Sequence, residues 1–126
     1  MSQSKFVTAI NCMDGRVQLP VIEWMKNEFS VPYIDMITAA GPNGVLLSDG
    51  AEEIELIKAK VRVSQEAHGS EAIAIIGHHD CAGNPIPKEE KLEQIKKSMD
   101  IIHGWGFPMD VLGLYVNENW EVERVK

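Results

Sequence analysis

Two cysteines and a histidine are the side chains of this sequence best suited to chemistry. One group lies in the segment GHHDCAGNP, residues 77–85, which overlaps the end of the apolar run EAIAIIG. It places two histidines, an aspartate and a cysteine within four residues, from His78 to Cys81. Taken alone, this segment is compatible with a polar turn, a redox cysteine or half of a metal site. A metal site therefore requires a second half elsewhere in the chain.

The second half-site is the segment CMDGR, which begins with the other cysteine, Cys12. Two thiolates and one imidazole suit zinc, because sulfur and nitrogen are its preferred donors and three protein ligands leave a fourth position open for water. The spacing of His78 and Cys81 lets one turn wrap around the ion, and zinc keeps bound cysteines deprotonated. Asp14 and Arg16 lie close enough to Cys12 to form a bidentate ion pair at the edge of this site.

Simpler interpretations of the same residues stay open. The cysteines could be inert core residues, or neighbours that oxidise when a metal is lost. His78 could be a hydrogen-bonded core histidine, and the pair of Asp14 and Arg16 could be a structural salt bridge. His79 is either an exposed neighbour of the site or a candidate proton shuttle, since the ordinary pKa of histidine is near 6.5.

Strand and helix patterns alternate along the chain. Apolar runs between turn residues predict strands at 5–13, 32–41, 71–80 and 109–116, with an alternating edge strand at 120–125. Helical spacing predicts helices at 18–29, 50–68 and 88–106. Residues 41–44, GPNG, predict a loop, and either Ser48 or Asp49 together with Glu52 predicts the start of the long helix. The residues expected on the buried side of that helix are Ile54, Ile57, Ala59, Val61 and Val63, with Gly69 at its end.

Alternating strands and helices predict an α/β fold of three layers, with a mostly parallel sheet of about five strands and helices on both faces. The strand order 2-1-3-4, with the last strand as an antiparallel edge, places strands 1 and 3 side by side. Ligands bind such sheets at the carboxyl ends of the strands that flank this switch point. Cys12 ends strand 1, and His78 and Cys81 lie at the end of strand 3. The topology thus brings the two half-sites together.

Length and composition limit the classes of function. The 126 residues predict one domain, residues 1–126, and the net charge of −7 argues against a nucleic-acid or anionic-membrane surface. No stretch is apolar enough for a transmembrane helix, and the first residues lack the features of a signal peptide, so a cytoplasmic location is expected. In a reducing compartment, metal binding or catalysis is favoured over a structural disulfide for the two cysteines.

The motifs CMDGR and GHHDC resemble the C-x-D-x-R and H-x-x-C motifs of the β-class carbonic anhydrases, and the predicted layout resembles that family along nearly the whole chain. The resemblance implies zinc held by Cys12, His78 and Cys81, with Asp14 and Arg16 as a catalytic pair beside the metal. It implies reversible hydration of carbon dioxide to bicarbonate by zinc-bound hydroxide. Alternatives on the same fold are hydrolysis of carbonyl sulfide or carbon disulfide, and a zinc-binding module without catalysis.

This chain departs from the family pattern at several points. Gly15 stands where the family usually has serine, and the segment ITAAGPNG lacks the arginine of the corresponding family stretch. AGNPIP follows the H-x-x-C motif in place of a longer insertion, and the N-terminal helices that wrap a partner subunit are missing. The resemblance still implies a homodimer or higher homo-oligomer acting on a small molecule. Asp14 could also swing onto the zinc and close the site.

Overall fold

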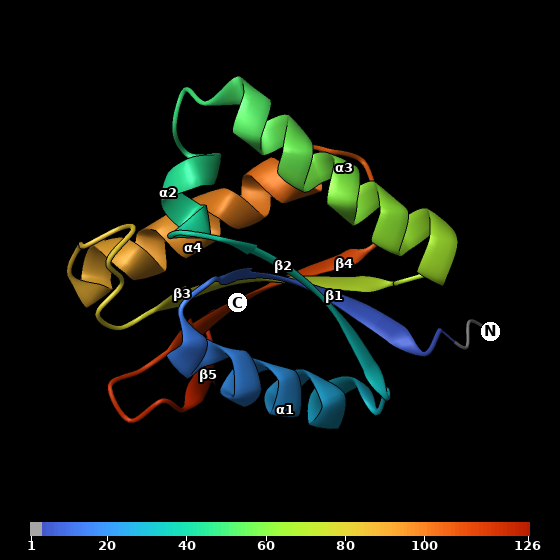
Figure 1. Ribbon diagram of the computed structural model, residues 1–126, viewed down its shortest axis with the longest axis horizontal. Coiled ribbons are helices and arrows are strands. Elements are labelled where there is room, and N and C mark those ends of the chain that lie inside the picture. The colour runs from blue at the N-terminus through green and yellow to red at the C-terminus, as the bar shows by residue number, and fades with distance from the viewer. Residues whose placement is uncertain (1–3) are drawn as a thin grey trace.

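The computed structural model describes residues 4–126 as a twisted five-stranded sheet with helices on both faces (Figure 1). The strand order is β2-β1-β3-β4-β5, and only the pairing of β4 with β5 is antiparallel. The strands are β1 Phe6–Cys12, β2 Tyr33–Ala39, β3 Ala72–His78, β4 Asp110–Val116 and β5 Val122–Arg124. The predicted fold class and strand order are therefore confirmed.

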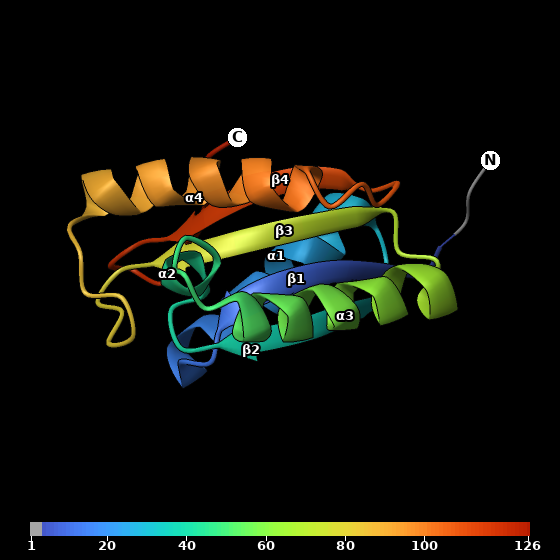
Figure 2. The same ribbon diagram turned by 90° about the horizontal axis from the view of Figure 1, so that it is seen from above.

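The helices form two layers, one on each side of the sheet (Figures 1 and 2). The helices are α1 Gln18–Phe29, α2 Pro42–Leu46, α3 Ala51–His68 and α4 Lys88–His103, and a 3-10 turn, Gly15–Val17, precedes α1. Helix α1 covers one face, whereas α2, α3 and α4 cover the other. Within the described part of the chain, no helix has the length and apolar character that a bilayer span requires.

Strand β3 is the centre of the core, and all seven of its residues are buried. Its side chains alternate between the two layers, as a strand covered on both faces requires. Ala74 and Ile76 pack in the cluster beneath α1, whereas Ile73 and Ile75 pack in the cluster beneath α3 and α4. The carboxyl end of β3 is thereby fixed from both sides, and that end carries His78.

Two local predictions about the segment between β2 and α3 were wrong. The segment GPNG does not form a plain loop, because helix α2 begins within it at Pro42, and Asn43 is buried and donates its side-chain amide to the carbonyl of Ile76. No side chain caps α3, whose N-cap is Gly50. The hydroxyl of Ser48 instead donates to Val45 O and accepts from the amide of Gly50, so that it stabilises the turn between α2 and α3.

The buried face of α3 also differs from the prediction. Ile57 and Val61 are buried as expected, but Val63 is 61% exposed and Ala59 faces solvent. The buried position in this part of the helix belongs to Ser64, whose hydroxyl lies 2.7 Å from that of Thr8 and donates to Asp35. Helix α4 ends at His103, three residues before the predicted boundary of 106, with Gly104 as its C-cap.

Candidate metal centre

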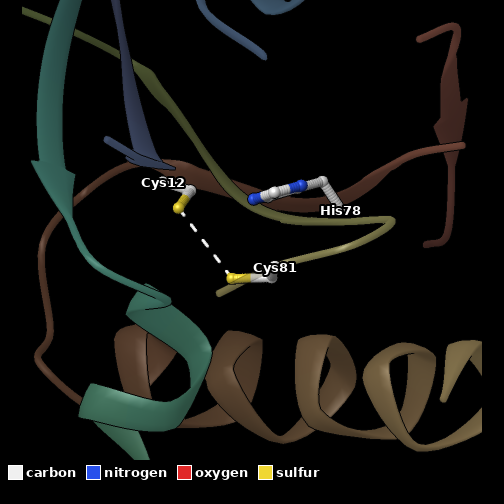
Figure 3. A group of neighbouring side chains, drawn as sticks. All are labelled: Cys12, His78 and Cys81. Atoms are coloured by element: carbon white, nitrogen blue, oxygen red, sulfur yellow. Dashed lines mark hydrogen bonds between the residues drawn. The ribbon is translucent and has the colours of Figure 1, made fainter. Parts of the chain in front are cut away.

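The carboxyl ends of β1 and β3 bring Cys12, His78 and Cys81 into one cluster (Figure 3). Cys12 is the last residue of β1, His78 is the last residue of β3, and Cys81 lies in the turn that follows. The sulfur atoms are 3.9 Å apart, and the three candidate donor atoms all lie within 4.8 Å of one another. All three residues are at most 5% exposed. Their spacing and chemistry match what one metal ion requires.

The imidazole of His78 is oriented by the backbone carbonyl of the next residue, His79. Nδ1 donates a hydrogen bond of 2.7 Å to the carbonyl of His79, which leaves Nε2 directed toward the two sulfur atoms (Figure 3). Nε2 is buried and has no hydrogen-bond partner among the described residues. Buried nitrogen atoms without a partner are rare and call for an explanation. A zinc ion among these three donors supplies one, because neutral imidazole nitrogen is a preferred zinc ligand.

The two thiols experience different surroundings. Burial raises the pKa of Cys12, but the neighbouring His78 and the backbone amides of Asp14 and Gly41 outweigh it and lower that pKa from 9.0 to about 6. Burial raises the pKa of Cys81, against the opposing effect of the Lys91 ammonium. The site therefore favours a thiolate at Cys12, and a metal ion bound there would deprotonate Cys81 as well.

Lys91 is a buried cation that the sequence analysis did not identify. This residue of α4 is 2% exposed, and its ammonium donates a 2.8 Å hydrogen bond to the carbonyl of Asn84, in the loop after Cys81. Burial lowers the pKa of Lys91, whereas the two cysteines raise it. Its position four residues before the buried Ile95, on the apolar side of the helix, is the sequence feature that could have identified it.

The loops that frame the cluster touch each other closely. A Cβ atom on Gly83 would lie 2.6 Å from the carbonyl carbon of Ala40, so only glycine allows the loop after Cys81 to pass the end of β2 at this distance. On the other side, the side-chain amide of Gln18 donates to the carbonyls of Cys12 and Asp14, at 2.7 and 3.0 Å. Close packing and hydrogen bonds thus hold the backbone on both sides of the cluster.

Asp14 and Arg16 form the ion pair that their spacing predicts. Nη2 of Arg16 lies 2.7 Å from Oδ2 of Asp14, Nε lies 3.1 Å from Oδ1, and the Arg16 backbone amide donates to Oδ1 at 2.8 Å. This guanidinium lowers the pKa of Asp14 from 3.8 to about 2. The ion pair raises the pKa of Arg16 in turn. Asp14 is therefore a carboxylate throughout the physiological range, with its oxygens in a fixed direction.

Arg16 has two further partners that sequence reasoning missed. Its Nη1 lies 3.2 Å from the carboxylate of Asp80, its Nη2 donates to the Asp80 carbonyl at 3.1 Å, and the ring of Trp120 lies 4.5 Å from the guanidinium carbon. Asp80 lies inside the GHHDC motif, which is a feature that could have identified it. Trp120 comes from the turn between β4 and β5, and no local pattern marks it.

His79 lies outside the cluster. It is exposed, its backbone amide donates to the carbonyl of Val116, and its ring lies 6.2 Å from that of Trp120 in an edge-on arrangement. It is therefore a neighbour of the aromatic ring beside Arg16, and the three donor atoms do not include it.

A small cavity opens beside the cluster. Its volume is about 230 Å³, and its lining is formed by Cys12, Met13, Asp14, Ala40, Ala82 and Gly83. Apolar atoms dominate this lining, which includes the candidate ligand Cys12 and the residue Asp14. A small neutral molecule in this cavity would lie against the candidate metal ligand Cys12 and against Asp14.

Solved structures with a similar fold include three β-carbonic anhydrases. Isoform I from the protozoan Trichomonas vaginalis is 19% identical, with a TM-score of 0.63 over 98% of this chain and 82% of that one. A tetrameric enzyme from the filamentous ascomycete Sordaria macrospora is 10% identical, with a TM-score of 0.62 over 98% and 81% of the two chains. The β-carbonic anhydrase CcaA is 15% identical, with a TM-score of 0.59 over 97% and 80%. At these identities, the likeness shows the fold.

A comparison with curated protein sequences gives no match. A family model described as "Putative carbonic anhydrase" matches residues 2–126, which is nearly the whole sequence. The resemblance that the motifs CMDGR and GHHDC indicated is thus confirmed at the level of family and fold. The chain belongs to this carbonic anhydrase family.

Proposed function

We propose that this protein is a zinc enzyme that catalyses the reversible hydration of carbon dioxide, with Cys12, His78 and Cys81 as the zinc ligands. The observation that carries the proposal is the buried, unpartnered Nε2 of His78 beside two thiols, next to a cavity that Asp14 lines. Zinc in this site would supply a Lewis acid that lowers the pKa of a bound water. The two-sulfur, one-nitrogen donor set leaves one tetrahedral position open for that purpose.

Asp14 is proposed to orient the attacking water. A carboxylate accepts hydrogen bonds and cannot donate them, so a water held by Asp14 directs its lone pair away from the carboxylate, toward the cavity. The bidentate contact with Arg16 holds the carboxylate in this role and keeps it ionised. The same contact opposes a swing of Asp14 toward the cysteines, because that movement would break the hydrogen bonds to Nε and Nη2.

The cavity favours a small, neutral and apolar substrate. Met13, Ala40 and Ala82 contribute alkyl surface to its lining, and the carboxylate of Asp14 would repel a substrate anion. Carbon dioxide satisfies both conditions, and bicarbonate, as an anion, would be released toward solvent. The side chain of Met13 is 64% exposed beside the cavity. We propose that a second copy of the chain covers this apolar wall in a homo-oligomer.

The hydration of carbon dioxide is the direct test of this function. Protein loaded with one zinc per chain should hydrate carbon dioxide in a stopped-flow assay far faster than the uncatalysed reaction. Replacement Asp14→Asn should keep the zinc and lower kcat at least about a hundredfold, because it removes a group that acts on the proton of the attacking water. A zinc-loaded wild-type protein without turnover would refute the proposed reaction, and an Asp14→Asn variant of equal activity would reduce the ion pair to a structural role.

The proposed ligand set makes a prediction about metal retention. Cys81→Ala should weaken zinc binding by more than about a hundredfold, since replacing residues outside the ligand shell already costs 10- to 100-fold in such sites. Zinc per chain is measured after dialysis against a chelator of known affinity. His79→Ala is the matched control, because it changes the adjacent exposed histidine and should leave zinc retention unchanged. Equal retention by the Cys81→Ala variant would mean that the ligand set is wrong.

The ionisation of Asp14 makes a prediction about pH. Arg16 is the main cause of the low pKa of about 2, so Arg16→Gln should raise the pKa of Asp14 toward 3.8. Because the folded-state pKa is depressed, the ion pair stabilises the fold above about pH 4, and this stabilisation is lost as the pH falls toward 2. Carboxyl carbon NMR of the two proteins reports both titrations. Identical Asp14 titrations in the two proteins would contradict the assignment of Arg16 as the cause.

A further inference from the structure

The guanidinium of Arg16 has partners on three sides, which we call the Arg16 clamp: Asp14, Asp80 and Trp120. Asp14 accepts hydrogen bonds from Nε and Nη2, and the Asp80 carboxylate accepts one from Nη1. The Trp120 ring covers the guanidinium, 4.5 Å from its central carbon. The clamp joins three segments that are far apart in the sequence, namely the turn after β1, the turn after β3 and the turn between β4 and β5.

Two members of the clamp adopt a left-handed backbone conformation, which residues other than glycine rarely adopt. The φ angles of Asp80 and Trp120 are 57° and 60°, and Ser30 is the only other non-glycine residue in the described chain with a positive φ. Such conformations persist where the surrounding structure enforces them, and they cluster at functional sites. For Trp120, which cannot form the local hydrogen bonds that help aspartate in this region, the surroundings must supply the whole constraint.

The constraint on Trp120 comes from a network centred on Asn117. The side-chain oxygen of Asn117 accepts from the backbone amides of Asn119 and Glu121, at 2.9 and 3.1 Å, and its carbonyl accepts from the amide of Trp120 at 2.9 Å. The half-buried ring of Trp120 also packs against the core cluster beneath α1. The turn is therefore rigid and holds the indole over Arg16.

The contacts of Trp120 and Asp80 with Arg16 are important because the Asp14–Arg16 ion pair is exposed to solvent. The Arg16 side chain is 46% exposed, and exposed ion pairs that involve long side chains contribute little, because solvent competes and rotamer entropy is lost. The ring and the second carboxylate limit the rotamers of Arg16 before it binds Asp14. The direction of the Asp14 oxygens then depends on residues that never touch them.

We propose that Trp120 and Asp80 are positioning residues for the Asp14–Arg16 pair, with Trp120 as the principal one. Their effect on turnover rests on the proposed function of Asp14, whereas their effect on Arg16 itself does not. Loss of the ring should leave the zinc ligands and the cavity lining unchanged and should lower kcat rather than raise KM, because the cavity lining does not include Trp120.

The test compares Trp120→Ala with Trp120→Phe, and uses Trp105→Ala as the matched control. Trp105 is a half-buried tryptophan between α4 and the start of β4. It lies near the amino-terminal end of β4, whereas the site is at the carboxyl ends of the strands. The Nε–Hε resonance of Arg16, assigned by its loss in Arg16→Lys, reports the clamp through the ring current of the indole and through its exchange with water.

Trp120→Ala should shift the Arg16 Hε resonance downfield, speed its exchange with water and lower kcat roughly two- to fivefold, the range expected for one exposed cation–π contact. Trp120→Phe should restore kcat, and Trp105→Ala should change neither readout. Because Trp120 also packs against the core, Asp80→Asn supplies a second variant, at a side chain that is 70% exposed. It should shift the Nη resonances of Arg16 and lower kcat by less than Trp120→Ala does.

An Arg16 resonance unchanged in Trp120→Ala would overturn the clamp, as would a changed resonance with unchanged kcat in an active enzyme. A zinc-loaded wild type without turnover would refute the proposed reaction alone, and the NMR comparison would still decide whether Trp120 holds Arg16.

Discussion

The unpartnered Nε2 of His78, buried between two thiols, is the constraint on which the site depends. A buried polar atom without a hydrogen-bond partner destabilises a fold. Here the Nε2 atom and the two sulfur atoms lie within 4.8 Å of one another. A metal ion removes that cost. The backbone fixes this arrangement. Nδ1 is hydrogen-bonded to the carbonyl of His79, and the strands β1 and β3 are buried in the core.

The sheet topology explains why the donors meet at this place. Because β1 and β3 are parallel neighbours and the chain winds away from them in opposite directions, their carboxyl ends lie side by side at the point where the strand order reverses. Close packing then decides the shape of that edge. Gly83 lets the loop of Cys81 pass against Ala40, and the buried ammonium of Lys91 holds the same loop through Asn84. Positive charge near two thiols also offsets part of the cost of their ionisation.

Residue types and spacing were sufficient to predict that Cys12, His78 and Cys81 lie together, and to predict the Asp14–Arg16 ion pair and the strand order. These features carry strong local patterns, because strands that are buried on both faces are nearly continuous apolar runs and the cysteine and histidine residues lie at their ends. Asp80, Lys91 and Trp120 could not be assigned in this way, since each acquires its role from a contact between distant segments. The predicted cap of α3 was wrong for a related reason. Because helix α2 forms just before it, the Ser48 hydroxyl binds Val45 O and the Gly50 amide instead.

X-ray absorption at the zinc edge of the purified, zinc-loaded protein tests the central claim most directly. Cys12 and Cys81 should supply two sulfur ligands at about 2.3 Å, and His78 together with one ligand from outside the protein should supply two nitrogen or oxygen ligands at about 2.0–2.1 Å. A first shell without sulfur, or with a single sulfur, would contradict the assignment of Cys12 and Cys81 as ligands. It would remove the basis for the proposed site.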